Sequence, residues 1–95
     1  MDSAFTVIER RLKAGTLEED RYVDGLRNLM KNKHATPAQH QRAQALLQKI
    51  ASTPKQALRV SALEALIKID EKKGKAFAKR FAKDKEIGEE VQRLR

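Results

Sequence analysis

The chain of 95 residues has the length of one small domain and carries a formal net charge of +8, from 21 Lys and Arg against 13 Asp and Glu. It has no cysteine, no run of about 18 apolar residues and no charged-then-apolar leader. These absences argue against a disulfide framework, a thiolate metal site, a membrane-spanning helix and a secreted precursor. We therefore expect one cytoplasmic domain over residues 1–95.

Two helices are expected in the N-terminal third, because apolar residues recur there at intervals of three and four. The first covers Phe5 to Leu12 and ends at Gly15, since glycine readily closes a helix. The second begins at Thr16, where Glu19 three residues later completes the spacing of a capping box. Its apolar stripe ends in the polar stretch of residues 31–34.

Two further helices are expected to begin at Thr36-Pro37 and Thr53-Pro54. Threonine accepts hydrogen bonds from first-turn amides, and proline at the first helical position loses no helical hydrogen bond. The helix over residues 53–69 carries apolar residues around more than half of its circumference, so we expect it at the centre of the domain. These residues are Leu58, Val60, Ala62, Leu63, Ala65, Leu66, Ile67 and Ile69.

The C-terminal third predicts a fifth helix after Asp70 and a sixth helix that Asp84 caps. The sixth helix carries an apolar stripe of Ile87, Val91 and Leu94. Such a stripe needs a cover. If the helix does not reach its own domain, these residues form an interface with a second chain and the protein self-associates.

The segment from residue 53 to residue 85 combines several residues at characteristic positions. They are Pro54, Leu58-Arg59, Ala62, Ala65-Leu66, Ile69-Asp70, Phe77, Phe81 and Lys83-Asp84-Lys85. With them, the segment resembles one unit of a HEAT-type helical repeat. The resemblance implies a HEAT-like hairpin within a compact all-α bundle of five or six short antiparallel helices. It divides the domain into N-terminal helices in residues 1–52 and a HEAT-like unit plus a terminal helix in residues 53–95.

Two further expectations come from the resemblance. In such repeats the arginine beside the early aliphatic residue pairs with an aspartate at the end of a first helix, which implies a structural ion pair between Arg59 and Asp70. Second helices of HEAT units also line the concave side of the stack, which would place the fifth helix there.

The sequence offers little for catalysis. It has no cysteine, and none of its three serines lies in a Gly-x-Ser-x-Gly elbow. His34 and His40 stand in a long stretch without acidic residues, so we interpret them as exposed to solvent and not as metal ligands. No glycine-rich phosphate loop occurs. We expect a non-enzyme without metal or cofactor.

Positive charge is concentrated in two segments of the chain. Residues 25–63 contain seven basic residues and no acidic one, and residues 72–83 contain six basic residues and no acidic one. Like charges at helical spacing destabilise a helix slightly, and an anionic partner would offset that repulsion. The basic face of the fifth helix consists of Lys72, Lys75, Lys79 and Lys83, with Arg80 and Lys73 to one side.

We therefore predict a binding module for an anionic partner. Lysines suit salt-dependent contact with phosphates better than bidentate base readout, so DNA or RNA without strong sequence preference is the first candidate. An acidic protein is the second. A lipid surface suits the fifth helix less, because its apolar side is half alanine. The three phenylalanines lie on apolar stripes, which leaves no aromatic platform for single-stranded bases. Auxiliary contacts are expected from Lys31, Lys33, Arg42 and Lys49.

Overall fold

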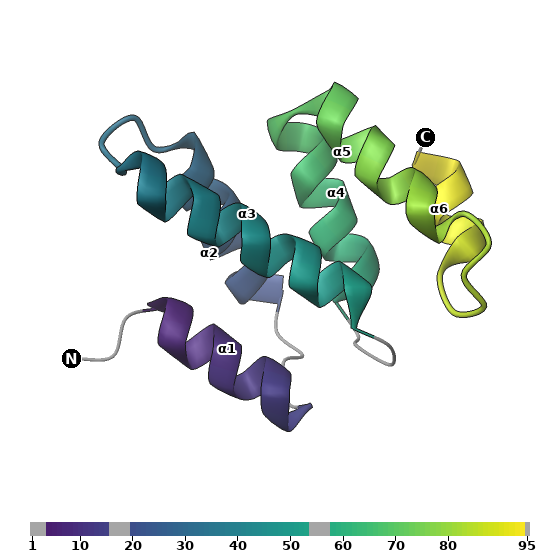
Figure 1. Cartoon of the computed structure of the whole chain (residues 1–95), viewed down its shortest axis with the longest axis horizontal. Coiled ribbons are helices and arrows are strands. Elements are labelled where there is room, and N and C mark those ends of the chain that lie inside the picture. Colours follow the sequence, from purple (N-terminus) through teal and green to yellow (C-terminus); the bar gives the residue numbers. More distant parts are fainter. Residues whose placement is uncertain (1–3, 16–19, 54–57, 95) are drawn as a thin grey trace.

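The computed structural model describes residues 4–15, 20–53 and 58–94, and within these ranges it contains six α-helices and no strand. The helices are α1 (Ala4–Ala14), α2 (Asp20–Lys31), α3 (Pro37–Ser52), α4 (Arg59–Ile69), α5 (Glu71–Ala78) and α6 (Gly88–Leu94), and a 3-10 turn, η1 (Lys79–Phe81), follows α5. The all-α helical bundle expected from the sequence is confirmed (Figure 1).

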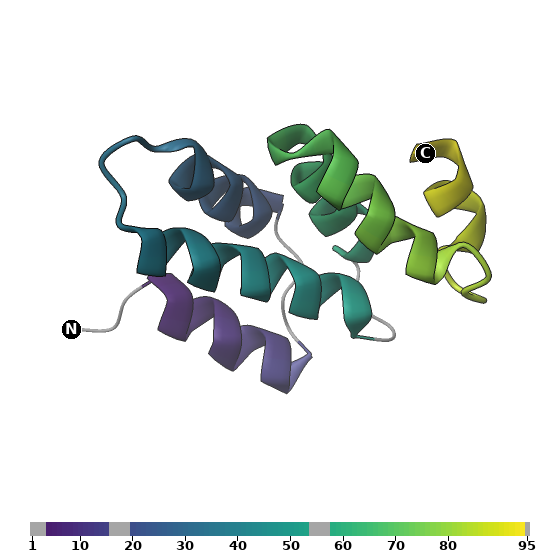
Figure 2. The same ribbon diagram turned by 45° about the horizontal axis from the view of Figure 1, so that its top comes forward.

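Helix α4 lies at the centre of the bundle, where it packs against α2, α3, α5 and α6. Figure 2 shows α1 and α2 on either side of α3, with α5 in front of α4. The fully or nearly fully buried residues of α4 include Ala62, Leu63, Ala65 and Leu66. A helix buried on several sides needs apolar residues around most of its circumference, so the prediction of a central fourth helix is confirmed.

The N-terminal helices follow the apolar periodicity. Phe5, Ile8 and Leu12 are buried and bring α1 against α3. Gly15 ends this helix with a φ of +75°, a conformation that glycine adopts without steric cost. The capping box predicted at Thr16 and Glu19 lies outside the residues that the structure describes.

The two Thr-Pro sites behave differently. Thr36 caps α3: its Oγ1 accepts from the Gln39 N–H at 3.1 Å, and Gln39 Oε1 accepts from the Thr36 N–H at 2.8 Å. Thr53 instead ends α3, because its hydroxyl donates to the Lys49 carbonyl at 2.7 Å. The described α4 begins at Arg59, so the start predicted at Thr53 is wrong; Pro54 lies outside the described residues.

The C-terminal stripe is covered by its own domain. Ile87 and Val91 are buried, and Leu94 packs against the same core. Helix α6 contacts α4 and η1, and Asp84 Oδ1 accepts from the Ile87 N–H at 3.2 Å just before the helix begins. The condition under which Ile87, Val91 and Leu94 were expected to form an interface is therefore not met, since α6 reaches the core of its own chain.

Candidate anion-binding surface

The basic segment around α5 is held in place by a cap and by close helix packing. Asp70 Oδ1 accepts from the Lys73 N–H at 3.1 Å and fixes the first turn of α5. Gly74 and Ala78 are buried against α4. These two residues face inward, whereas Lys72, Lys79 and Lys83 are exposed. The fifth helix, whose predicted basic face reached Lys83, ends as an α-helix at Ala78, and η1 extends it for one tighter turn.

Three lysines of this segment are exposed and available. Lys72, Lys79 and Lys83 are exposed, and no ion pair to any of them occurs within the described ranges. Arg80 is also exposed, and its guanidinium carbon lies 5.4 Å from the centre of the Phe77 ring. We call Lys72, Lys79, Arg80 and Lys83 the basic row.

Lys75 is less available than its position on the predicted face indicated. Its Nζ lies 2.8 Å from Glu71 Oε1, one helical turn earlier, and its side chain is partly buried. The hydrogen bond and the charge of Lys75 lower the pKa of the Glu71 carboxyl. The acidic residue immediately before the lysine run thus neutralises one of its members.

The auxiliary residues on α3 face away from α5. Arg42 Nη2 lies 3.0 Å from Glu9 Oε1 on α1, and its guanidinium carbon lies 4.7 Å from the centre of the Phe5 ring. Lys49 is two turns further along α3 and therefore shares the face of Arg42. Figure 1 shows α1 and α4 on opposite sides of α3, so these two residues do not converge with the basic row.

The remaining auxiliary residues lie at the end of the molecule away from α6. Lys31 ends α2, and Lys33 lies in the turn between α2 and α3 (Figure 1). Both are exposed and have no ion pair in the described part of the chain. The structure thus divides the predicted contacts into the basic row on α5 and η1, a pair on α3, and a pair at the α2–α3 turn.

Arg59 forms an ion pair, but not with the predicted partner. Its Nη2 lies 2.8 Å from Asp84 Oδ2 and its Nη1 lies 3.2 Å from Glu86 Oε2, while its Nε donates to the Ala51 carbonyl at 2.9 Å. The predicted Arg59–Asp70 pair is wrong. A helical side chain leans toward the N-terminus of its helix, and Arg59 is the first residue of α4 whereas Asp70 follows the last.

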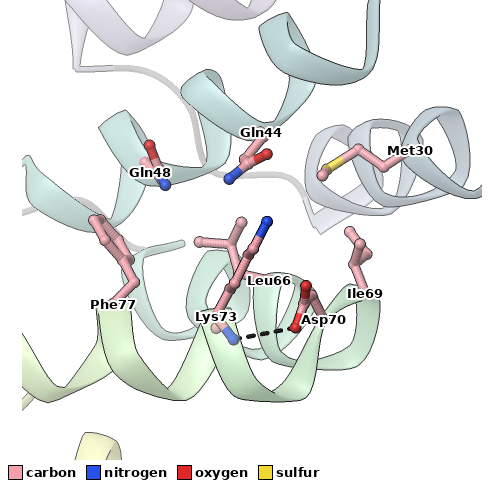
Figure 3. A pocket seen from close by; sticks show the side chains of 9 residues that line it. Met30, Gln44, Gln48, Leu66, Ile69, Asp70, Lys73 and Phe77 are labelled. Atoms are coloured by element: carbon pink, nitrogen blue, oxygen red, sulfur yellow. Dashed lines mark hydrogen bonds between the residues drawn. The ribbon is translucent and has the colours of Figure 1, made fainter. Parts of the chain in front are cut away.

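A pocket of about 210 Å³ opens between α3 and α5 (Figure 3). Its floor is formed by Leu66 and Ile69 of α4, and Met30 of α2 closes one end. The polar and aromatic residues that line its walls are Gln44, Gln48, Asp70, Lys73 and Phe77. None of these residues is among the ligand contacts predicted from the sequence. The feature of the sequence that could have indicated this pocket is the pair Gln44 and Gln48, which lie one turn apart on the same face of α3.

The two histidines lie near the α2–α3 turn. His40 Nε2 lies 3.0 Å from the Asn32 carbonyl oxygen, and the backbone N–H of His34 donates to Asn32 Oδ1 at 2.8 Å. Across residues 4–15, 20–53 and 58–94, His and carboxylate side chains form no cluster of three that could hold a metal ion. None of the helices described for this chain has the length and apolar character needed to cross a membrane.

Comparison with known proteins gives no family assignment, because no family model, curated protein or solved structure matches this chain. The candidate site therefore rests on the residues and their geometry.

Proposed function

We propose that this chain is a non-catalytic binding module that holds nucleic acid by its phosphate backbone, with the basic row as the main contact. The observation that carries the proposal is the state of Lys72, Lys79 and Lys83, which are exposed and without ion pairs in the described structure. Lysines that make no internal contacts contribute repulsion to the free protein. Phosphates along the row would remove that repulsion and release counterions from the nucleic acid.

The geometry supports backbone contact without base readout. Lysine is a point charge with no fixed fork for a base pair, and only Arg80 in the row has such a fork. The Arg80 guanidinium already lies over the Phe77 ring, which holds it at the edge of the row. We therefore expect little sequence preference.

We also propose that the helices form HEAT-like pairs. In support, α2 packs on α3, α4 packs on α5, and α4 contacts both helices of the preceding pair. In such a stack α3 and α5 are the second helices, and the pocket between them lies on the side that a HEAT-type array would make concave.

Fluorescence anisotropy with a random-sequence duplex, measured in a salt series from about 50 to about 200 mM, tests the proposal. Log affinity should fall linearly with log salt, with a slope of about −3 for three to four phosphate contacts. The double variant Lys79→Glu/Lys83→Glu should bind more weakly, with a slope smaller by about 2.

The matched control is Lys13→Glu/Lys68→Glu, which changes the net charge equally at exposed positions on α1 and α4. It should retain most of the affinity, because these residues lie outside the basic row. Equal losses in both variants would mean that only net charge matters. If no duplex binds at about 50 mM salt while polyglutamate does, the row serves an acidic protein and the nucleic-acid proposal is overturned.

A further inference from the structure

The pocket between α3 and α5 contains hydrogen-bonding groups that the protein itself leaves unused. Gln44 and Gln48 are partly buried, and their side-chain amides make no hydrogen bond within the described part of the chain. Lys73 extends across the pocket toward Gln44 and has no ion pair there (Figure 3). Asp70 uses one carboxylate oxygen to cap α5, which leaves the other as an acceptor. Asp70 and Lys73 are exposed, whereas the two partly buried glutamine amides gain from a ligand that supplies their hydrogen-bond partners.

The apolar surfaces of the pocket limit the shape of that ligand. Leu66 and Ile69 form an aliphatic floor, and the Phe77 ring lies at the end of the pocket away from Met30 (Figure 3). The volume of about 210 Å³ is below the roughly 300–1,000 Å³ of pockets for drug-sized molecules. A small ligand with apolar faces and a polar edge fits these surfaces.

We infer that this pocket binds one unpaired nucleobase of a single strand whose phosphates lie along the basic row. The inference rests on the proposed function and adds a second contact to it. A base has two apolar faces and an edge with adjacent hydrogen-bond donors and acceptors. The pocket offers partners for that edge, which are the amides of Gln44 and Gln48, the carboxylate of Asp70 and the ammonium of Lys73. Unpaired bases also commonly stack on aromatic rings and guanidinium planes. Phe77 lines the pocket, and the guanidinium carbon of Arg80 lies 5.4 Å from the centre of its ring.

The alternatives fit the pocket less well. An acidic peptide side chain would meet the carboxylate of Asp70, which is oriented toward the same space as Lys73 (Figure 3). A purely aliphatic side chain would leave Gln44 and Gln48 without partners. The wall residues Lys73 and Phe77 alternate along α5 and η1 with Lys72, Lys79 and Arg80, so a strand on the row has a base within reach of the pocket.

Phe77 lies both at the core and at the pocket. Its position on an apolar stripe predicted a core residue, and the ring does pack against the core. In the structure the ring is only partly buried, makes an edge contact with Phe81 at 5.4 Å between centroids, and lines the pocket.

The test compares single-stranded oligomers of about eight nucleotides with oligomers of the same length in which every base is replaced by an abasic site. All four base-containing homopolymers are measured by anisotropy against the wild-type chain. We expect at least one of them to bind about ten-fold more tightly than the abasic strand. In Gln44→Ala/Gln48→Ala that advantage should disappear, while Gln41→Ala, an exposed position on the same helix, should keep it.

The outcomes separate this inference from the proposed function. Lys79→Glu/Lys83→Glu should weaken base-containing and abasic strands alike. Equal binding of both strands to the wild-type chain overturns the pocket assignment and leaves backbone binding intact. Failure of every strand and of the duplex overturns both proposals.

An NMR measurement addresses the fold of the variants and the identity of the occupant. The side-chain amide resonances of Gln44 and Gln48 should shift when the base-containing oligomer is added, and not when the abasic strand is added. If they shift with N-acetyl-leucinamide and with no oligomer, the pocket is a peptide site and the nucleobase inference fails. Backbone spectra of each variant that overlay those of the wild type establish that the affinity changes do not come from unfolding.

Discussion

Arg59 brings a positive charge into the interior, where an isolated ion would cost several kcal/mol. The residue is only 2% exposed. The charge is accommodated because three residues from two segments supply acceptors: the carbonyl of Ala51 at the end of α3, and the carboxylates of Asp84 and Glu86 after η1. The guanidinium also lies 5.7 Å from the centre of the Phe81 ring. One side chain thus connects α3, the start of α4 and the segment before α6.

The sequence predicted that Arg59 is structural but could not identify its partner. Arg59 and Asp70 stand at opposite ends of α4, about 16 Å apart along the helix axis, and the arginine leans away from that aspartate. Asp84 lies 25 residues after Arg59 in the chain, and it comes close to Arg59 only because α5 folds back along α4. Local spacing carries no information on such a contact.

The ion pair makes stability depend on pH. The hydrogen bond from Arg59, supported by the N–H of Glu86, lowers the pKa of Asp84 below its ordinary value of 3.8. A carboxyl whose pKa is lower in the folded state stabilises the fold above the unfolded-state value, and this contribution is lost as the pH falls through the folded-state value. We predict that the free energy of unfolding, measured with urea between about pH 6 and about pH 3, declines in wild type and declines less in Asp84→Asn.

The same variant should also be less stable at neutral pH, by about 3 kcal/mol, because it leaves the buried guanidinium short of a charged partner. Asp24→Asn is the matched control. Its exposed contact with Arg27, at 3.4 Å, should contribute less than about 1 kcal/mol. If the free energy of unfolding falls by the same amount between about pH 6 and about pH 3 in wild type and in Asp84→Asn, Asp84 is not the source of the pH dependence.

At the scale of the helices, α4 and α5 approach more closely than side chains normally allow. A Cβ atom added to Gly74 would lie 2.5 Å from the Cα and N atoms of Ile67. Glycine is therefore required at this position because the backbone of the neighbouring helix occupies the space. Its φ is not in the left-handed region, so backbone strain plays no part.

We predict that Gly74→Ala destabilises the domain by about 1–3 kcal/mol, because the Cβ forces α5 away from α4. The control is Gly25→Ala in α2, where the added Cβ meets no atom within 4 Å. Since alanine favours a helix interior over glycine, this control should gain about 0.5–1 kcal/mol. Urea unfolding of both variants measures the two effects, and a stabilised Gly74→Ala chain would contradict the close approach.

Helix positions were largely predictable, whereas helix ends depended on tertiary contacts. The apolar periodicity located α1, α2 and α3, and it identified α4 as central, because burial imposes a 3.6-residue repeat. Thr53 has the same Thr-Pro context as Thr36 but closes a helix instead of opening one. The end of α5 at Ala78 has no comparable signal in the sequence, since Phe81 and Ala82 continue the helical spacing.

Across the whole molecule, ion pairs reduce the charge that is available for a partner. Lys75 pairs with Glu71, Arg42 with Glu9, and Arg59 with acidic residues before α6. The basic row keeps its charge because residues 72–83 contain no acid and none is folded against it in the described structure. The sequence predicted all four residues of this row, but it did not predict the pocket, because side chains of α2, α3, α4 and α5 line it together.

The packing of α6 on its own chain bears on whether the protein self-associates. The sequence left open whether the stripe on this helix is covered by its own domain or by a second chain. Val91 is fully buried within its own chain, and α6 contacts α4 and η1. With the stripe covered and the surface strongly positive, like-charged chains repel each other at low salt. We therefore predict a monomer of 10.8 kDa, measured by light scattering after size-exclusion chromatography over a range of protein concentrations.

Val91→Asp places a charge in the covered position and should release α6, which exposes the apolar face beneath it. This variant should be less stable by several kcal/mol and should elute with a mass that rises with concentration. Arg93→Asp, at an exposed position of the same helix, should remain monomeric with nearly unchanged stability. A wild-type mass of twice 10.8 kDa at all concentrations would contradict the prediction of a monomer. It would indicate that α6 covers the core of a second copy of the chain instead of its own.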